Sequence, residues 1–424
     1  MLKPGEAWQC LLPYLDPLPA EALPRRLALG RTVAEALAAT LDVPASDVSA
    51  MDGYALAGEV AAGEVRPVVG TVAAGDPPGL KVPAGAAARI MTGAPVPAGA
   101  DRVIQVEWTD GGCEQVTFHR GAEPGAHIRR RGEIQRAGEP LLAPGDLLTP
   151  GALALLATHG IGEVAVFGAP RVAVLTTGDE VVAPERAPGP GQLRDSNTDF
   201  LLAAGASLGL GFTSLGIAPD RVEALSPLVE RGLASDALLL CGGVSAGVFD
   251  LVEGVLAGLG CRTLFDAVAM QPGKPLVAAH HPGGLVFGLP GNPASVAVGF
   301  WLFVRPALRR LMGLEDGYWH GALAGELQAP LPAAKDRDRF LPAEVTFEGG
   351  RLRVAPVSAR GSHDLAAFAR GTALLRVPAG SPAASPGDPC EVLPLADWRT
   401  SRERLMAMPA HASVPPEGVP SWRA

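Results

Sequence analysis

Four glycine-containing turns are the parts of this 424-residue chain best suited to bind a ligand. They occupy residues 176–180 (Thr-Thr-Gly-Asp-Glu), 241–247 (Cys-Gly-Gly-Val-Ser-Ala-Gly), 271–275 (Gln-Pro-Gly-Lys-Pro) and 289–293 (Leu-Pro-Gly-Asn-Pro). Three of them follow apolar runs typical of strands, at 171–175, 237–240 and 284–287. In open parallel sheets, ligands lie beyond the carboxyl ends of the strands, and glycine lets backbone N–H groups approach an anion closely. The turns therefore predict one shared anion-binding cleft.

Charged residues accompany these turns. Asp179 and Glu180 end the first turn, where adjacent carboxylates can bind a hard cation such as Mg²⁺, although an isolated pair more often caps a helix or stays solvated. Asp250 follows the second turn and begins a predicted helix, so it is either an N-cap or a ligand. Lys274 is a candidate point charge for phosphate or another oxyanion, or a solvated loop lysine.

Two earlier segments have the same character. Residues 49–55 (Ser-Ala-Met-Asp-Gly-Tyr-Ala) contain Asp52, and residues 89–95 (Arg-Ile-Met-Thr-Gly-Ala-Pro) place Thr92 in a tight turn after a strand. Their spacing does not show whether either residue serves a site. No Ser/His/Asp or Cys/His arrangement is evident, so nucleophilic catalysis by the protein is not supported. From the residues alone, the chain is an enzyme or binding protein for a phosphorylated or oxyanionic small molecule, using carboxylates and Mg²⁺.

The composition excludes several classes of protein. A net charge of −9 argues against nucleic-acid binding, and 48% hydrophobic residues argue against disorder. Five scattered cysteines without a C-x-x-C motif fit a reducing compartment and predict no zinc site. No signal peptide is evident, and the most apolar stretch, 285–304, contains two prolines and is a poor membrane span. We therefore expect a soluble cytoplasmic protein that binds no membrane.

The order of elements predicts several domains. Helices are expected at 6–15, 32–41 and 150–159, a strand at 163–167, and short strands between turns from residue 43 to 135. Strands at 171–175, 212–217, 236–241, 263–269 and 284–288 alternate with helices at 197–208, 221–233, 250–259 and 293–311, which predicts a parallel sheet. Beyond residue 321 the pattern favours short strands again, and residues 400–424 have no periodicity.

Seven motifs, in order along the chain, carry a resemblance to a known family. They are residues 49–55, 89–97, 177–180, 195–197 (Asp-Ser-Asn), 242–250, 271–275 and 289–293, and residues 361–363 (Gly-Ser-His) match the family's last domain. Together they resemble the molybdopterin molybdenumtransferase (MoeA) family, to which the gephyrin E domain is related. The resemblance covers residues 1 to about 395.

The resemblance implies an α/β multidomain fold with a central parallel-sheet α/β domain and a homodimer whose active cleft is shared between subunits. The expected domains are an elongated linker domain (1–42 and 136–170), an inserted β-rich domain (43–135), an α/β molybdopterin-binding domain (171–316), a C-terminal β-barrel (317–397) and a disordered tail (398–424).

The implied activity is the insertion of molybdenum from molybdate into adenylylated molybdopterin, with Mg²⁺-dependent release of AMP. The catalytic residues carried over from the motifs are Asp52, Thr92, Glu180, Asp250 and Lys274, and the carboxylates among them are the metal ligands. The residues expected to bind the pterin substrate are Gly178, Asp179, Ser196, Asn197, Gly242, Gly243, Ser245, Gly247, Pro272, Gly273, Pro290, Gly291, Asn292, Pro293 and Ser362. Expected protein partners are the molybdopterin adenylyltransferase and the molybdoenzymes that receive the cofactor.

The chain departs from the family pattern at three places. The family's Gly-Glu-Asp-Ile is replaced by Gly132-Glu133-Ile134-Gln135, Cys241 stands where a Ser or Thr is common, and Val248 occupies a position that is often polar. Three alternatives stay open: a nucleotide-pyrophosphate hydrolase of related α/β fold, a tungsten-preferring paralogue, and a non-catalytic scaffold.

Overall fold

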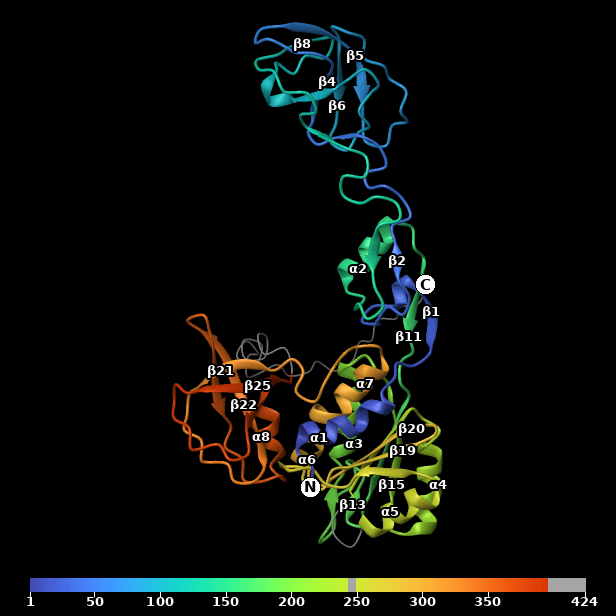
Figure 1. The fold of residues 1–424 in the computed structure, drawn as a ribbon, viewed down its shortest axis with the longest axis vertical. Helices are drawn as coiled ribbons and strands as arrows, with labels where there is room; N and C mark the ends of the chain where they lie inside the picture. Colours follow the sequence, from blue (N-terminus) through green and yellow to red (C-terminus); the bar gives the residue numbers. More distant parts are fainter. Residues whose placement is uncertain (243–248, 396–424) are drawn as a thin grey trace, which may run out of the picture. The chain divides into compact units, whose positions relative to one another are not determined.

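The computed structural model describes residues 1–242 and 249–395, with the backbone alone at 249 and 250. The chain forms two compact units, one made of residues 22–166 and the other of residues 1–21 and 167–424 (Figure 1). The tail expected at 398–424 and most of the turn 241–247 lie outside the described residues. In the described parts of the chain, no helix is both long and apolar enough to cross a membrane.

The first unit contains a five-stranded β sheet. Its strands lie in the order β7 (Arg102–Gln105), β4 (Gly53–Leu56), β6 (Ala87–Ile90), β5 (Val65–Val72) and β8 (Gln115–Thr117). Tyr54, Ile104 and Phe118 are fully buried in its core. The short strands β3 (Val48–Ser49) and β9 (Ile128–Arg129) pair where the chain enters and leaves this sheet. The short strands expected between residues 43 and 135 are therefore confirmed.

The rest of this unit holds small pairs of strands and one helix. β1 (Ala20–Pro24) pairs with β11 (Glu163–Phe167), and β2 (Leu37–Ala38) pairs with β10 (Pro140–Leu142). Helix α2 (Pro150–Thr158) begins where Thr149 Oγ1 accepts a hydrogen bond from Ala152 N at 3.2 Å. This helix and β11 confirm the expectations at 150–159 and 163–167.

The prediction of a helix at 32–41 is wrong. The segment runs as an extended chain with strand β2 at 37–38, and Thr32 and Val33 form isolated bridges to Leu147 and Val166. Val33 is fully buried in a small core formed with strand β11 and helix α2. Burial across neighbouring strands has overridden the local helix propensity here.

The second unit is built on a six-stranded sheet. The order is β15 (Phe212–Ala218), β12 (Val172–Thr177), β16 (Ala237–Cys241), β20 (Gly284–Leu289), β19 (Val277–His281) and β17 (Arg262–Phe265). The first four strands run parallel to one another, as expected from the alternation of strands and helices. β19 was not expected; it runs antiparallel to both β20 and β17, so the sheet is mixed.

Helices cover both faces of this sheet. They are α3 (Asn197–Ser207), α4 (Val222–Gly232), α5 (Phe249–Gly258) and the sequence α6 (Pro293–Gly299), η4 (Phe300–Val304) and α7 (Arg305–Leu311). Along β12, Val172 and Val174 join one buried core, while Ala173 and Leu175 join another. Helix α1 (Pro4–Leu11), followed by the short turn η1 (Leu12–Tyr14), belongs to the first of these cores. The expected helices at 197–208, 221–233, 250–259 and 293–311 are confirmed.

A closed barrel follows in the same unit. β22 (Asp338–Glu348), β23 (Arg351–Pro356), β21 (Leu323–Leu327), β25 (Pro389–Pro394) and β24 (Ala373–Val377) are neighbours in this order, and β24 pairs back with β22. Helix α8 (Leu365–Arg370) lies between β23 and β24 in sequence. Strand β18 (Met270–Gln271), which comes from the α/β part, runs parallel to β22. The expected fold class is confirmed, while the proposed domain boundaries stay a prediction.

Candidate functional site

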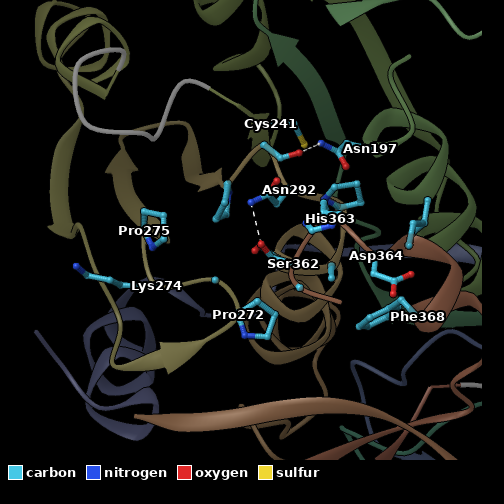
Figure 2. Close-up of a pocket in the computed structure, with 18 of the residues that line it drawn as sticks. Asn197, Cys241, Pro272, Lys274, Pro275, Asn292, Ser362, His363, Asp364 and Phe368 are labelled. Atoms are coloured by element: carbon cyan, nitrogen blue, oxygen red, sulfur yellow. Dashed lines mark hydrogen bonds between the residues drawn. The ribbon is translucent and has the colours of Figure 1, made fainter. Parts of the chain in front are cut away.

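A cavity of about 1250 Å³ lies beyond the carboxyl ends of β12, β16 and β20. Its opposite wall comes from residues 333–342 and 359–368, which belong to the barrel region of the same unit. Residues of all four glycine turns line it, and Figure 2 shows side chains from several of them around one space. Within the described residues, the gathering of the turns expected from their position after strands is therefore confirmed.

At the floor of the cavity, by which we mean the turns that contain Thr177, Gly242 and Gly291, main-chain atoms of one turn pack directly against those of another. Gly242 has φ of +91°, and a Cβ added there would lie 2.3 Å from Thr177 O. Its N–H donates to Leu289 O at 3.1 Å, which joins the ends of β16 and β20. A Cβ on Gly291 would lie 3.8 Å from the Cα of Gly242. The turns therefore approach one another without side chains between them, as close binding of an anion by backbone N–H groups requires.

Two asparagines tie the loops of the cavity together. Asn292 Nδ2 donates to Ser362 Oγ at 2.8 Å, and Ala294 N donates to Ser362 O at 3.0 Å (Figure 2). Asn197, at the start of α3, donates from Nδ2 to Gly291 O at 2.8 Å. The hydroxyl of Ser362 is thus held at the cavity wall by a residue of the turn 289–293. Pro272, Gly273, Pro290, Pro293, Ser196 and Gly178 also line the cavity.

The carboxylates near the first turn divide into two kinds. Asp195 accepts hydrogen bonds from Asn197 N and Thr198 N, both at 3.0 Å, and so caps α3. Asp220 accepts from Thr177 Oγ1 at 2.5 Å, although both it and Asp195 line the cavity. Glu180, by contrast, is an exposed side chain on the lining.

Asp179, which was expected to contact the substrate, is not among the residues that line the cavity, and its role stays a prediction. Its Oδ1 accepts from Asp220 N at 3.3 Å, which is a structural role at the end of β15. Asp220 itself was missed by the sequence reasoning, because it follows a strand without a glycine turn.

The carboxylates at the cavity fit a Mg²⁺ site in which substrate phosphates supply some of the ligands. They do not fit a site in which the protein supplies all of them. Among the described residues, no group of three or more His, Cys, Asp or Glu side chains could hold a metal ion. Mg²⁺ is usually held by one or two carboxylates together with water and substrate phosphates. Glu180 suits that mode of binding, and the Asp250 side chain lies outside the described residues, as do Gly243, Ser245 and Gly247.

Basic side chains also reach the cavity. Lys274 was expected, but Lys335, Arg337 and Arg339 were not. The parallel pairing of β18 with β22 places Gln271 opposite Arg339, which brings the barrel segment beside the turn 271–275. Because this contact joins residues far apart in the chain, no local pattern could reveal it.

Asp52 and Thr92 form a bonded pair in the unit of residues 22–166. Thr92 N and Thr92 Oγ1 donate to Asp52 Oδ1 at 2.6 and 2.7 Å, and both residues are exposed. The backbone N–H and then the hydroxyl of Thr92 hold the pKa of Asp52 below its ordinary value, and the charge of Arg89 acts in the same direction. The pair therefore presents an ionised carboxylate in a fixed orientation.

The departures from the family pattern have visible consequences. Cys241 is fully buried at the end of β16, and burial raises the pKa of its thiol far above the ordinary value. It stays a neutral thiol at physiological pH and supplies no charge. In the other unit, Gln135 Oε1 lies 2.9 Å from Nε2 of the buried His159, so the side chain at position 135 makes a partly buried hydrogen bond.

Comparison with known proteins gives a consistent result. Three family models match: "MoeA N-terminal region (domain I and II)" at residues 2–160, "Probable molybdopterin binding domain" at 173–310 and "MoeA C-terminal region (domain IV)" at 324–395. The chain is 36% identical over 318 residues to molybdopterin molybdenumtransferase 2 of Mycobacterium tuberculosis, covering 74% of this chain and 78% of the relative. It is 30% identical over 408 residues to molybdopterin molybdenumtransferase of Staphylococcus aureus, covering 95% and 97%. The crystal structure of a molybdopterin biosynthesis MoeA protein from Pyrococcus horikosii is similar, with a TM-score of 0.79 and 32% identity over 94% of this chain and 100% of that one.

Proposed function

Because this chain belongs to the MoeA family, we propose that it is a molybdopterin molybdenumtransferase of molybdenum cofactor biosynthesis. It inserts molybdenum from molybdate into adenylylated molybdopterin and releases AMP. The observation that carries the proposal is the cavity in which glycine turns at three strand ends face basic residues. Both molybdate and the phosphoanhydride of the substrate are anions, and this arrangement offers backbone N–H donors and positive side chains to them.

Several residues of the cavity have a role in this scheme. Lys274 and the backbone N–H groups of Gly291 and Asn292 hold anionic oxygens, and Ser362, fixed by the Asn292 side chain, offers a hydroxyl beside them. Glu180 holds Mg²⁺ together with phosphate oxygens of the substrate, and Asp250 is its proposed companion. Bound Mg²⁺ neutralises charge that develops when the phosphoanhydride is hydrolysed. The chain's own contribution is to orient the anions on a rigid floor.

We further propose that the working form is a homodimer in the cytoplasm. Leu27, Leu29 and Leu147 have exposed fractions of 71%, 58% and 42%, and main-chain hydrogen bonds join Gly30 to Leu148 and Leu148 to Arg31. Exposed leucines on two segments joined by main-chain hydrogen bonds favour burial against a second copy. In the dimer, the pair formed by Asp52 and Thr92 would complete the cavity of the other subunit. This exposed pair would then serve the reaction, a role that the fold of its own unit does not require.

The test is AMP release from adenylylated molybdopterin by the purified protein with Mg²⁺, with and without molybdate. We expect AMP release that depends on molybdate and yields an active cofactor. Equal release in the absence of molybdate would identify a pyrophosphate hydrolase instead, and bound substrate without release would identify a non-catalytic paralogue. Parallel reactions with tungstate determine which oxyanion is preferred.

A further inference from the structure

Ser49 is a buried polar residue just before the segment that carries Asp52. Its exposed fraction is 1%, and it lies in β3 opposite Ile128 of β9, which belongs to a core of apolar side chains. Burying a hydroxyl costs free energy unless the hydroxyl is hydrogen-bonded, so an apolar residue would fill such a position at lower cost. Packing alone therefore does not account for a serine here.

The hydroxyl of Ser49 bonds to the turn that leads into Asp52. Ser49 Oγ donates to Met51 O at 2.5 Å and accepts from Met51 N at 3.3 Å. The side chain thus closes a short turn on the main chain, as serine hydroxyls do when they bond to a residue two positions further on. Both of these bonds end one residue before Asp52, so they act on the direction in which the chain enters it.

The main chain of Ser49 holds the turn that carries Thr92. Ser49 N donates to Ala94 O at 2.9 Å, and Ser49 O accepts from Gly93 N at 2.8 Å. These two bonds fix the residues that directly follow Thr92. One buried residue therefore contacts the segment of Asp52 with its side chain and the segment of Thr92 with its main chain.

We propose that Ser49 is a positioning residue for the pair formed by Asp52 and Thr92. The pair depends on precise geometry, because Thr92 N and Thr92 Oγ1 both reach the same oxygen, Asp52 Oδ1, at 2.6 and 2.7 Å. Ser49 is buried and acts only through this pair, so it is not itself a catalytic residue. The inference rests on the proposed function, since Ser49 matters to the reaction only if the pair does.

The first measurement is hydrogen exchange by NMR on full-length Ser49→Ala without ligand. This variant loses the hydroxyl and keeps the main-chain bonds of Ser49. We expect exchange of the Thr92 amide to become about tenfold faster, because the carboxylate that it donates to is no longer held in place. The factor should be smaller for the buried Val103 amide, which donates to Ala126 O at 3.0 Å. A purely structural role would accelerate both amides by the same factor.

The second measurement is the steady-state kinetics of AMP release from adenylylated molybdopterin. Lys274 and Gly291, which line the cavity, belong to the other unit and are not touched by the substitution. We expect kcat of Ser49→Ala to fall about tenfold to a hundredfold, because a small displacement of a catalytic group can cost this much. KM should change by less than about threefold, because the residues that bind the substrate are kept.

The matched control is Thr109→Val. Thr109 Oγ1 donates to Val106 O at 2.8 Å and accepts from Gly111 N at 3.1 Å, so it closes a turn in the same way as the hydroxyl of Ser49. This turn is not one of the two that carry the pair. Exchange at Thr92 and kcat should therefore equal those of the unaltered protein.

Three results would overturn the positioning role: unchanged exchange at Thr92 in Ser49→Ala, equal acceleration at Thr92 and Val103, or an equal effect of Thr109→Val. A raised KM with an unchanged kcat would also overturn it. The exchange measurement needs no substrate, so it can refute the role of Ser49 while molybdate-dependent AMP release still supports the proposed function. Absence of that release from the unaltered protein would refute the proposed function alone.

Discussion

Replacing Gly242 by alanine should distort the floor of the cavity more than the same change elsewhere in the α/β part. Gly242 has φ of +91°, a conformation that costs a residue with a Cβ about 1 to 3 kcal/mol. The new Cβ would also lie 2.3 Å from Thr177 O, so the backbone must move by about 0.7 Å to reach the 3.0 Å below which such contacts are not found. Overpacking of this kind costs a further 1 to 3 kcal/mol or so. The expected loss is about 2 to 6 kcal/mol in the free energy of unfolding of this part.

Gly260→Ala is the matched control. Gly260 has φ of +80° but no atom within 4 Å of an added Cβ, so its replacement introduces the backbone strain without the contact. We expect a loss of about 1 to 3 kcal/mol there. The difference between the two variants therefore isolates the contact with Thr177.

The assay must be local, because a chain with several domains need not unfold in one step. Hydrogen exchange of the Gly242 amide, which donates to Leu289 O at 3.1 Å, reports the opening of this floor. Exchange should be faster in Gly242→Ala than in Gly260→Ala, and AMP release should fall because Thr177 lines the cavity. Equal exchange protection and equal activity in both variants would refute the argument that close packing of these turns shapes the site.

Three further results are expected. Glu180→Gln should keep the thermal unfolding temperature and abolish metal transfer, because the Glu180 side chain is exposed and makes no hydrogen bond to the other described residues, while the bond from Leu193 N to Glu180 O is kept; full cofactor yield would remove it from the site. Thr92→Val should move the pKa of Asp52 up towards 3.8 but not beyond, since the larger backbone donor remains, and carbon NMR of the carboxyl group measures this. The stability contributed by that pair is present above pH 3.8 and lost as pH falls through the lowered pKa, so the variant should lose this contribution at a higher pH than the unaltered protein. Leu29→Asp should weaken association of subunits in analytical ultracentrifugation. Equal association of the variant and the unaltered protein would contradict the proposed interface, and an unaltered protein that is solely monomeric would contradict the proposed dimer.

Much of the secondary structure was predictable from local pattern. Helix α2 follows a Thr-Pro start that satisfies its first donors, and β12 and β16 are uninterrupted apolar runs ending in glycine turns. The expectation failed at 32–41, where burial of Val33 among strands decided the conformation. It also missed β19, a short run ending in two histidines whose place beside β20 is set by pairing across a tight turn.

The sequence by itself determined that glycine turns follow parallel strands, and hence that their backbones meet at one edge of the sheet. It also contained the motifs that identify the family, because these depend on residue types in order. Only the tertiary structure decided what faces the turns. The pairing of β18 with β22 brings Lys335, Arg337 and Arg339 to the cavity, and the hydrogen bond from Asn292 brings Ser362 there. Such contacts between distant segments depend on the closure of a barrel and the packing of two cores, for which no local period in the chain exists.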